Sequence, residues 1–184
     1  LRLLEAGAVA GLQFAAALVA AAVDRPVSEV EGACAEIARQ NSLIAPAGAE
    51  EWPDGAVSSR FGFAHALYRE ALAERLPAAL GVEIHRRVGE RLAVAYGPSA
   101  DEVAGQLAMH FERGRDMAAA VHWLQKAGDA SVRRKAAREA AAHYEHALEL
   151  QKDVPPGRAR DEARARLQLA LCAPLIALHG MGSS

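Results

Sequence analysis

Residues 99–178 read as one helical segment after another, and this feature most constrains what the chain can fold into. The interruptions are short: Gly114, a bend near Ala136, and a proline-containing run at residues 153–157. Short connections place neighbouring helices side by side and antiparallel. The expected helices span residues 99–114, 116–136, 137–151 and 158–178. Helix pairs of this kind indicate a helical repeat.

One of these pairs matches the residue spacing of a tetratricopeptide repeat (TPR). The first helix carries the W-x-x-L-G positions and the second the A-x-x-x-F-x-x-A positions, with the required spacing of twelve from Gly128 to Ala140. Small residues are needed where two helices cross closely, and a large aromatic residue fills the groove between successive pairs. The residues expected to make this packing are Leu124, Ala127, Gly128, Ala140, Tyr144 and Ala147.

Two departures are typical of a divergent repeat. Ser131 stands where the pattern has an aromatic residue, and Pro155 and Pro156 come a few residues late. Because a single repeat cannot bury its own apolar face, we expect the last helix to have a packing partner beyond residue 184, in a longer array. The start of the chain, which has no initiator Met, likewise suggests a piece of a longer protein. The apolar positions of the last helix are Leu167, Leu171, Leu175 and Leu178.

The first half of the chain has a different plan. Two short helices are expected at residues 2–10 and 15–22, separated by the sequence GLQF, in which a glycine can end the first helix. A third helix follows, and Ser28 with Glu31 three residues later forms a capping box that would open it.

Two short apolar runs, residues 43–45 and 60–63, then flank a loop rich in proline and glycine. This arrangement predicts a two-stranded hairpin, and three short helices followed by such a hairpin match the winged-helix plan, with the hairpin as the wing. Two more helices are expected at residues 65–76 and 79–96. The apolar face expected on the first of them consists of Leu67, Ala71, Leu72 and Leu76.

The predicted fold class is therefore mainly α. Residues 1–98 form a winged-helix-like domain with a small β-hairpin wing and trailing helices, and residues 99–184 form an α-α TPR-like superhelix. A hydrophobic content of 52% with 24% charged residues is typical of a globular chain that buries a core. Cys34 and Cys172 lie in apolar helical patterns and are expected to be buried free thiols, which fits a cytoplasmic location.

Charge and hydropathy disfavour two classes of partner. The net charge is −2, and neither half carries the positive field that tight binding to a phosphate backbone needs. The third helix, which would read DNA in a winged helix, presents Glu29, Glu31 and Glu36, although Arg25 and the wing remain possible contacts. No run of 18 uninterrupted apolar residues predicts a membrane span.

The chain lacks the motifs of common catalytic sites. His143 and His146 lie three residues apart, but no cysteine or acidic set completes a zinc site, so we expect no metal. No Walker A loop, G-x-S-x-G elbow or kinase signature occurs, so we expect no enzymatic activity in this segment. A basic cluster at Arg133, Arg134, Lys135 and Arg138 is either a solvated helix face or a contact for a partner or phosphate.

Taken together, several sequence blocks resemble the region that follows the nucleotide-binding core in bacterial STAND-type predicted ATPases with TPR arrays. These proteins are often fused to an adenylate/guanylate cyclase-like domain or to a transcription-regulator domain. The resemblance extends over nearly all 184 residues and implies ATP or ADP in the full-length protein but no cofactor in this segment. The matching blocks are LLEAGAVAGLQF, APAGAEEWPDG, RFGFAHALYREALAERLP, HRRVGERL, AMHFERGRD and AVHWLQKAGDAS.

The resemblance assigns a role to His65. In that family a histidine at the start of the last winged-helix helix reaches the phosphates of bound ADP, and His65 in FAHALYREAL matches it. Ala64 and Ala66 replace the Met and Asp of the Met-His-Asp signature in related NB-ARC proteins, so the histidine alone carries over. The alternative is that His65 caps this helix or bonds the wing backbone.

The resemblance implies a regulatory and scaffold segment of a multidomain signalling ATPase. Its partners would be the upstream nucleotide-binding domain of the same chain and a protein or inducer on the TPR surface. One alternative is a DNA-binding winged-helix transcriptional regulator with a helical sensor domain. Another is a helical adaptor that needs only the repeats.

Overall fold

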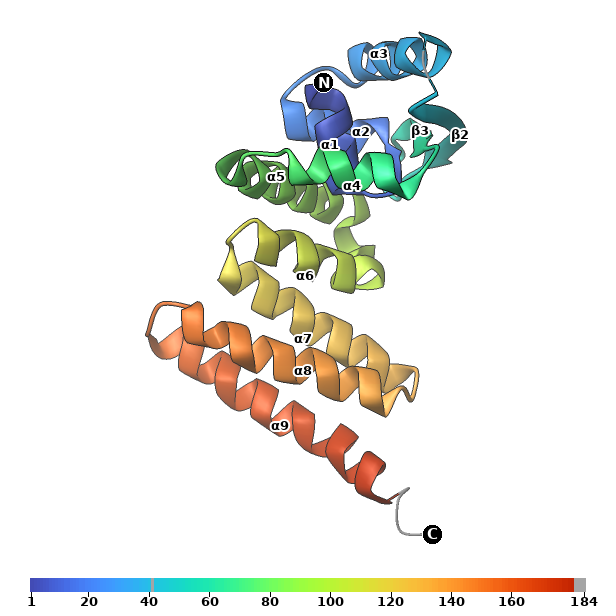
Figure 1. Ribbon diagram of the computed structural model, residues 1–184. Helices are drawn as coiled ribbons and strands as arrows, with labels where there is room; N and C mark the ends of the chain where they lie inside the picture. The colour runs from blue at the N-terminus through green and yellow to red at the C-terminus, as the bar shows by residue number, and fades with distance from the viewer. Residues whose placement is uncertain (41, 181–184) are drawn as a thin grey trace. The chain divides into compact units, whose positions relative to one another are not determined.

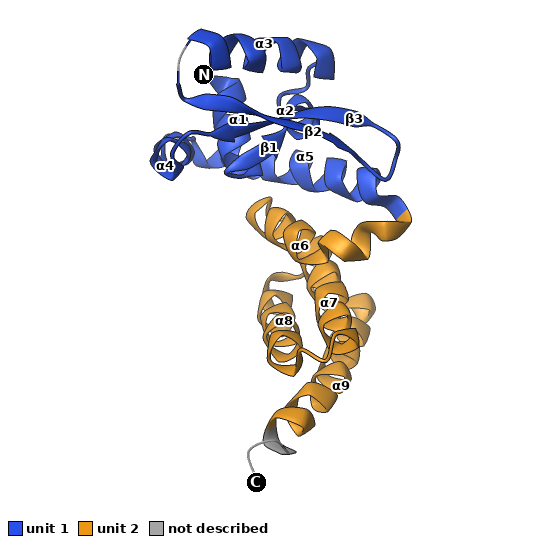
Figure 2. Ribbon diagram, turned by 90° about the vertical axis from the view of Figure 1, so that its right-hand side faces the viewer, with its two compact units in different colours: residues 1–97 blue, residues 98–184 orange. Residues whose placement is uncertain are grey.

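The computed structural model describes residues 1–40 and 42–180, which are mainly helical with a small three-stranded antiparallel sheet. The chain divides into two units, Leu1–Gly97 and Pro98–Ser184 (Figure 2). Unit 1 contains the sheet, and the described part of unit 2 is helical. The expectation of a mainly helical chain is thus confirmed, whereas the sheet has one more strand than the predicted hairpin.

Unit 1 is built around α2, a helix that is apolar on all sides. It packs against the helices α3 and α5 and against β3, the central strand of the sheet. Six of its eight residues are buried. Its first turn receives a cap from a distant strand, because Ser58 Oγ accepts a hydrogen bond from the Ala17 amide at 3.0 Å. The elements of the unit are α1 (Arg2–Ala10), β1 (Gln13–Ala15), α2 (Ala16–Val23), α3 (Val27–Gln40), β2 (Ile44–Glu51), β3 (Val57–Phe63), α4 (Ala66–Glu74) and α5 (Ala78–Tyr96).

The sheet has the strand order β1-β3-β2. The strand that was not predicted is β1, which lies where the sequence indicated only a break between two helices. β1 pairs with β3 so that Phe14 lies opposite Phe61, and the Phe14 ring also packs at 5.5 Å from that of Phe63. Gly7 on α1 makes room for this ring, since a Cβ there would lie 2.9 Å from the Phe14 ring. A strand of three residues that runs straight into a helix has no alternating pattern, which is why sequence reasoning missed it.

In the hairpin, the strands β2 and β3 are longer than predicted, and the loop between them is shorter. The strands extend to the turn at residues 52–56, where the Trp52 amide donates to the Ala56 carbonyl at 2.9 Å. A bulge interrupts β2 between Pro46 and Ala49, with Gly48 at φ 90°. A proline and a bulge are tolerated because β2 is an edge strand.

The predicted capping box does not form, because α3 already begins at Val27 and Ser28 lies inside its first turn. The carboxylate of Glu31 instead accepts a hydrogen bond at 2.7 Å from the amide of Ser59 on β3. Glu31 therefore ties α3 to the sheet, a tertiary contact that a local sequence pattern cannot distinguish from a cap.

In unit 2 successive helices lie next to one another (Figure 1). Two of the turns between them have the same geometry: Arg115 and Lys135 adopt positive φ, and the amides of Asp116 and Ala136 each donate at 2.9 Å to a carbonyl five residues back. This is the Schellman helix end, repeated after α6 and after α7. The elements are η1 (Gly97–Val103), α6 (Ala104–Arg113), α7 (Met117–Arg133), α8 (Ala137–Leu150), η2 (Gln151–Asp153) and α9 (Arg158–Gly180).

Candidate functional site

His65 lies at the position that precedes the first turn of α4, in extended conformation with φ −139° and ψ 142°. Its side chain is exposed and makes no capping hydrogen bond to the helix. The imidazole contacts the ring of Tyr68 edge-on, with 5.4 Å between ring centroids. The sequence left open that His65 instead caps α4 or hydrogen-bonds to the backbone of the hairpin. Among the described residues, the His65 side chain makes neither hydrogen bond.

The surface of α4 around His65 is open. None of its residues is buried, and the side chain of Leu67 is 73% exposed. The apolar face expected from the sequence is therefore rotated: Leu67 and Ala71 point to solvent, whereas Leu72 and Leu76 are half-buried beside Arg69 and Ala73. The packed side is set by α1, which α4 contacts, and an isolated helical pattern does not contain that information.

The tip of the hairpin is held against α5 by Arg91. Its guanidinium lies 4.6 Å from the centre of the Trp52 ring and forms an ion pair with Asp54 at 2.8 Å. The amide of Ala56 and then Arg91 hydrogen-bond to Asp54 and lower the pKa of its carboxyl. Trp52 in turn donates to the carboxylate of Glu50 at 2.6 Å, so the Trp52 side chain joins the two carboxylates of the tip to Arg91.

Basic side chains near the hairpin and α3 are paired with carboxylates. Arg60 on β3 lies 3.4 Å from Glu50, and Arg25 lies 2.6 Å from Glu29. Arg39 near the end of α3 pairs with Glu36. Each of these three cations therefore has a carboxylate beside it, which lowers the local positive charge that a phosphate backbone would meet.

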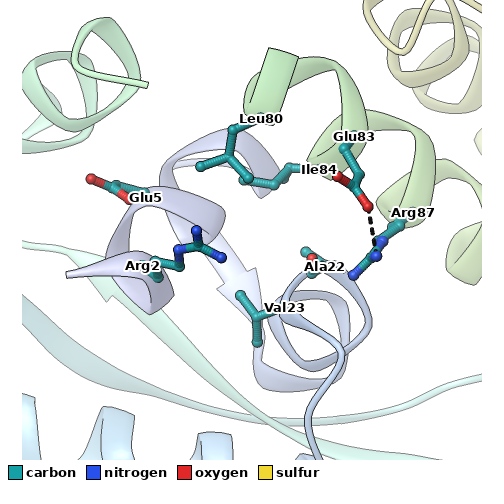
Figure 3. A pocket seen from close by; sticks show the side chains of 8 residues that line it. All are labelled: Arg2, Glu5, Ala22, Val23, Leu80, Glu83, Ile84 and Arg87. Atoms are coloured by element: carbon teal, nitrogen blue, oxygen red, sulfur yellow. Dashed lines mark hydrogen bonds and ion pairs between the residues drawn. The ribbon is translucent and has the colours of Figure 1, made fainter. Parts of the chain in front are cut away.

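A small cavity of about 100 Å³ opens in unit 1 between α1, α2 and α5 (Figure 3). Arg87 donates to the carboxylate of Glu83 at 2.6 Å and to the carbonyl of Ala22, near the end of α2, at 3.3 Å. Arg2 and Glu5 complete a balanced set of two cations and two anions. Ligand pockets are usually about 300–1,000 Å³, so this cavity is too small for a nucleotide. The hydrogen bond from Arg87 to the Ala22 carbonyl caps the C-terminal end of α2.

The six residues expected to make the TPR packing are all buried. Gly128 on α7 lies directly against the Tyr144 ring on α8, where an added Cβ would come within 2.8 Å of Cδ1. The hydroxyl of Tyr144 donates to Asp129 at 2.7 Å, and burial together with this bond raises the pKa of the phenol. The structure thus brings α7 and α8 into the close crossing that these residue types require.

Three described histidines of unit 2, His122, His143 and His146, lie on helix surfaces where they are exposed or half-buried. Nε2 of His146 on α8 lies 3.2 Å from a carboxylate oxygen of Glu112 on α6. Burial lowers the pKa of His122 and that of His143. Within residues 1–40 and 42–180, no group of three or more histidine, cysteine, aspartate or glutamate side chains could hold a metal ion. Of the two cysteines, Cys34 is buried as expected, but Cys172 is exposed, because it lies on the side of α9 that no described element covers.

Sequence reasoning missed a groove between the α7–α8 turn and the second half of α9. Two adjoining hollows of about 220 and 690 Å³ meet there at Lys135, Ala137 and Ala177. The signal in the sequence was a second apolar stripe on α9, which includes Leu169 and Ile176 at 76% and 73% exposure. The apolar face predicted for α9 was a different one, the stripe that contains Leu167, and Leu167 is buried.

A comparison with protein-family models, with curated proteins and with solved structures finds no match for this chain. In the part of the chain that the structure describes, no helix is both long and apolar enough to cross a lipid bilayer.

Proposed function

We propose that this chain is a non-catalytic regulatory and scaffold segment of a cytoplasmic, multidomain STAND-type ATPase. In this proposal unit 1 is a winged-helix module that senses the nucleotide state of an upstream domain. Unit 2 is a TPR-like array that binds a protein partner or inducer. ADP in the upstream domain would hold the closed state, and nucleotide exchange would release the module.

The single observation that carries the proposal is the state of His65. Its imidazole stands exposed at the N-terminus of α4, where the helix has no side-chain cap. Backbone amides at a helix N-terminus together with an imidazole donor suit a phosphate. The exposed Leu67 and the partly exposed Tyr68 surround it with apolar surface of the kind that a neighbouring domain covers.

Two further features support the module assignments. In unit 1 a three-stranded sheet with a terminal β-hairpin lies beside α1 to α3, an arrangement that winged helices share. In unit 2 the repeated Schellman turns and the contact of Gly128 with Tyr144 favour a repeat of antiparallel helices. The DNA-binding alternative is not favoured, since Arg25, Arg39 and Arg60 are paired with carboxylates.

The test uses the protein extended upstream to include its preceding domain. We expect this protein to retain ADP, and His65→Ala to release ADP at least tenfold faster, because hydrogen bonds to charged groups contribute roughly 1.5–3 kcal/mol and about 1.4 kcal/mol is tenfold. Stopped-flow release of a fluorescent ADP analogue measures the rate. His65→Asn, which keeps a donor, should lie between the two.

His146→Ala is the matched control, because His146 is also exposed but lies in unit 2. Its release rate should equal that of the parent protein. An extended protein that binds no adenine nucleotide would refute the proposal, and so would equal release rates for His65→Ala and His146→Ala.

A further inference from the structure

The tip of the β2–β3 hairpin extends beyond a point where β3 is tied to two helices. Ser58 Oγ accepts a hydrogen bond from the Ala17 amide of α2 at 3.0 Å, and the Ser59 amide donates to Glu31 of α3 at 2.7 Å. Residues 51–57, called here the hairpin flap, lie past this anchor and reach the C-terminal part of α5 (Figure 2). The flap is therefore fixed at its base and projects from there.

The other side of the hairpin has a point at which the strand can bend. β2 is an edge strand, and a bulge interrupts its pairing with β3 between Pro46 and Ala49. Gly48 in this bulge adopts φ 90°, and a Cβ added to it would meet no described atom within 4 Å. Bulges and glycines of this kind let a strand change direction.

The hydrogen bonds within the flap do not hold it to α5. The Trp52 amide donates to the Ala56 carbonyl at 2.9 Å, and the Gly55 amide donates to the Trp52 carbonyl at 2.8 Å. The Ala56 amide also donates to the Asp54 carboxylate at 3.0 Å, and the Trp52 indole donates to Glu50 at the base of the flap. Because each of these bonds joins two residues of the hairpin, the flap keeps its shape whether or not it contacts α5.

Arg91 on α5 makes the contacts that hold the flap closed. Its guanidinium lies 4.6 Å from the centre of the Trp52 ring and 2.8 Å from the Asp54 carboxylate. The side chains of this ion pair are 21% and 27% exposed, so water reaches both. Part-exposed ion pairs and cation–π contacts are each weak, and contacts of this strength permit an open state beside the closed one.

The position of Arg91 gives these contacts a consequence for α5. The helix ends at Tyr96, five residues after Arg91, and Gly97 follows with φ 45° at the boundary of the two units. The ends of helices open more readily than their centres. The closed flap therefore restrains the part of α5 that would otherwise open first.

We propose that the hairpin flap is a strap that closes on the last turns of α5, with Arg91 as its latch. In the closed state Trp52 and Asp54 hold Arg91, and the end of α5 is ordered. In the open state the flap turns about the anchor of β3 and the bulge of β2, Trp52 meets solvent, and the end of α5 frays. The strap involves no nucleotide and goes beyond the proposed function.

Trp52 reports the state of the strap, because it is 6% exposed in the closed flap. Trp123→Phe removes the fluorescence of the other tryptophan and serves as the background. In it, Arg91→Ala should favour the open state by roughly tenfold, since two weak contacts are lost. Acrylamide quenching of Trp52 should then rise about twofold or more. Arg86→Ala, an exposed change on the same helix, should leave the quenching unchanged.

Hydrogen exchange tests the effect on α5. In Arg91→Ala, the amides of residues 93–96 should exchange roughly tenfold faster than in the parent chain, and those of residues 84–88 at the same rate. Alanine has at least the helix propensity of arginine, so faster exchange does not come from propensity. Arg91→Lys, which keeps the charge but not the planar guanidinium, should lie between Arg91→Ala and the parent chain. An unchanged melting temperature will show that each variant is folded.

Quenching in Arg91→Ala that equals quenching in Arg86→Ala would overturn the proposal, and so would unchanged exchange of residues 93–96. If Arg91→Ala does not fold, relaxation dispersion on the parent chain decides. The amides of residues 51–57 and the Trp52 indole should then share one exchange process that residues 60–63 lack, and flat profiles would overturn the proposal. Failure here leaves the ADP-release test intact, and failure of that test leaves the strap intact.

Discussion

At the scale of single residues, glycine decides how closely two helices of unit 2 approach. Gly128 and Tyr144 were both identified from repeat spacing, and the structure places them in direct contact. The spacing was informative because it encodes a steric requirement at one crossing point. Cys172 shows the opposite case, since an apolar neighbourhood in the sequence did not reveal that its side of α9 is uncovered.

We expect Gly128→Ala to lower the free energy of unfolding by about 1–3 kcal/mol, because the new methyl group overlaps the Tyr144 ring. Gly105→Ala is the matched control, since Gly105 lies in α6 with no atom within 4 Å of the added carbon. Because Gly105 lies in the first turn of α6, that change should raise the free energy of unfolding by at most about 0.5–1 kcal/mol, the value for a helix interior. Urea denaturation measures both, and a neutral or stabilising Gly128→Ala would contradict the packing described.

At the scale of elements, tertiary partners decided what the local pattern left open. The helices were predicted well because their apolar periodicity and breaks are strong signals. The pattern did not reveal β1, the rotated face of α4, or the use of Glu31 as a tie between α3 and β3. In each case the deciding contact comes from an element distant in the sequence, such as Ser59, 28 residues from Glu31.

The hairpin tip gives a prediction about pH. The folded-state pKa of Asp54 lies below its unfolded value of 3.8, because the Ala56 amide and Arg91 stabilise the carboxylate. Its contribution to stability is therefore complete above pH 5 and is lost as the pH falls through the lower folded pKa. Asp54→Asn should be less stable than the parent chain at pH 7, and this difference should shrink below pH 4.

Urea denaturation at several pH values measures this difference. Glu145→Gln serves as the control, because Glu145 is exposed on α8 and has no ion-pair partner among the described residues. A difference between Asp54→Asn and the parent chain that stays constant from pH 7 to pH 3 would show that the Ala56 amide and Arg91 do not stabilise the Asp54 carboxylate in the folded chain.

At the scale of the whole molecule, the chain joins two units with different tasks in the proposed function. Unit 1 offers an exposed histidine at a helix end, and unit 2 contains an apolar groove beside α9. The position of His65 at the start of α4 could be anticipated from sequence, since the junction of a strand and a helix was visible there. The groove beside α9 could not be anticipated from the sequence, because it depends on how α8 and α9 diverge along their lengths (Figure 1).

The most direct test of the central claim is an NMR measurement on the upstream-extended protein with ¹⁵N-labelled histidine. The account predicts that ADP changes the imidazole signals of His65 strongly and leaves those of His146 unchanged, because only His65 would meet the phosphates. Saturating ADP that leaves the His65 signals where they are in the nucleotide-free protein would contradict the account.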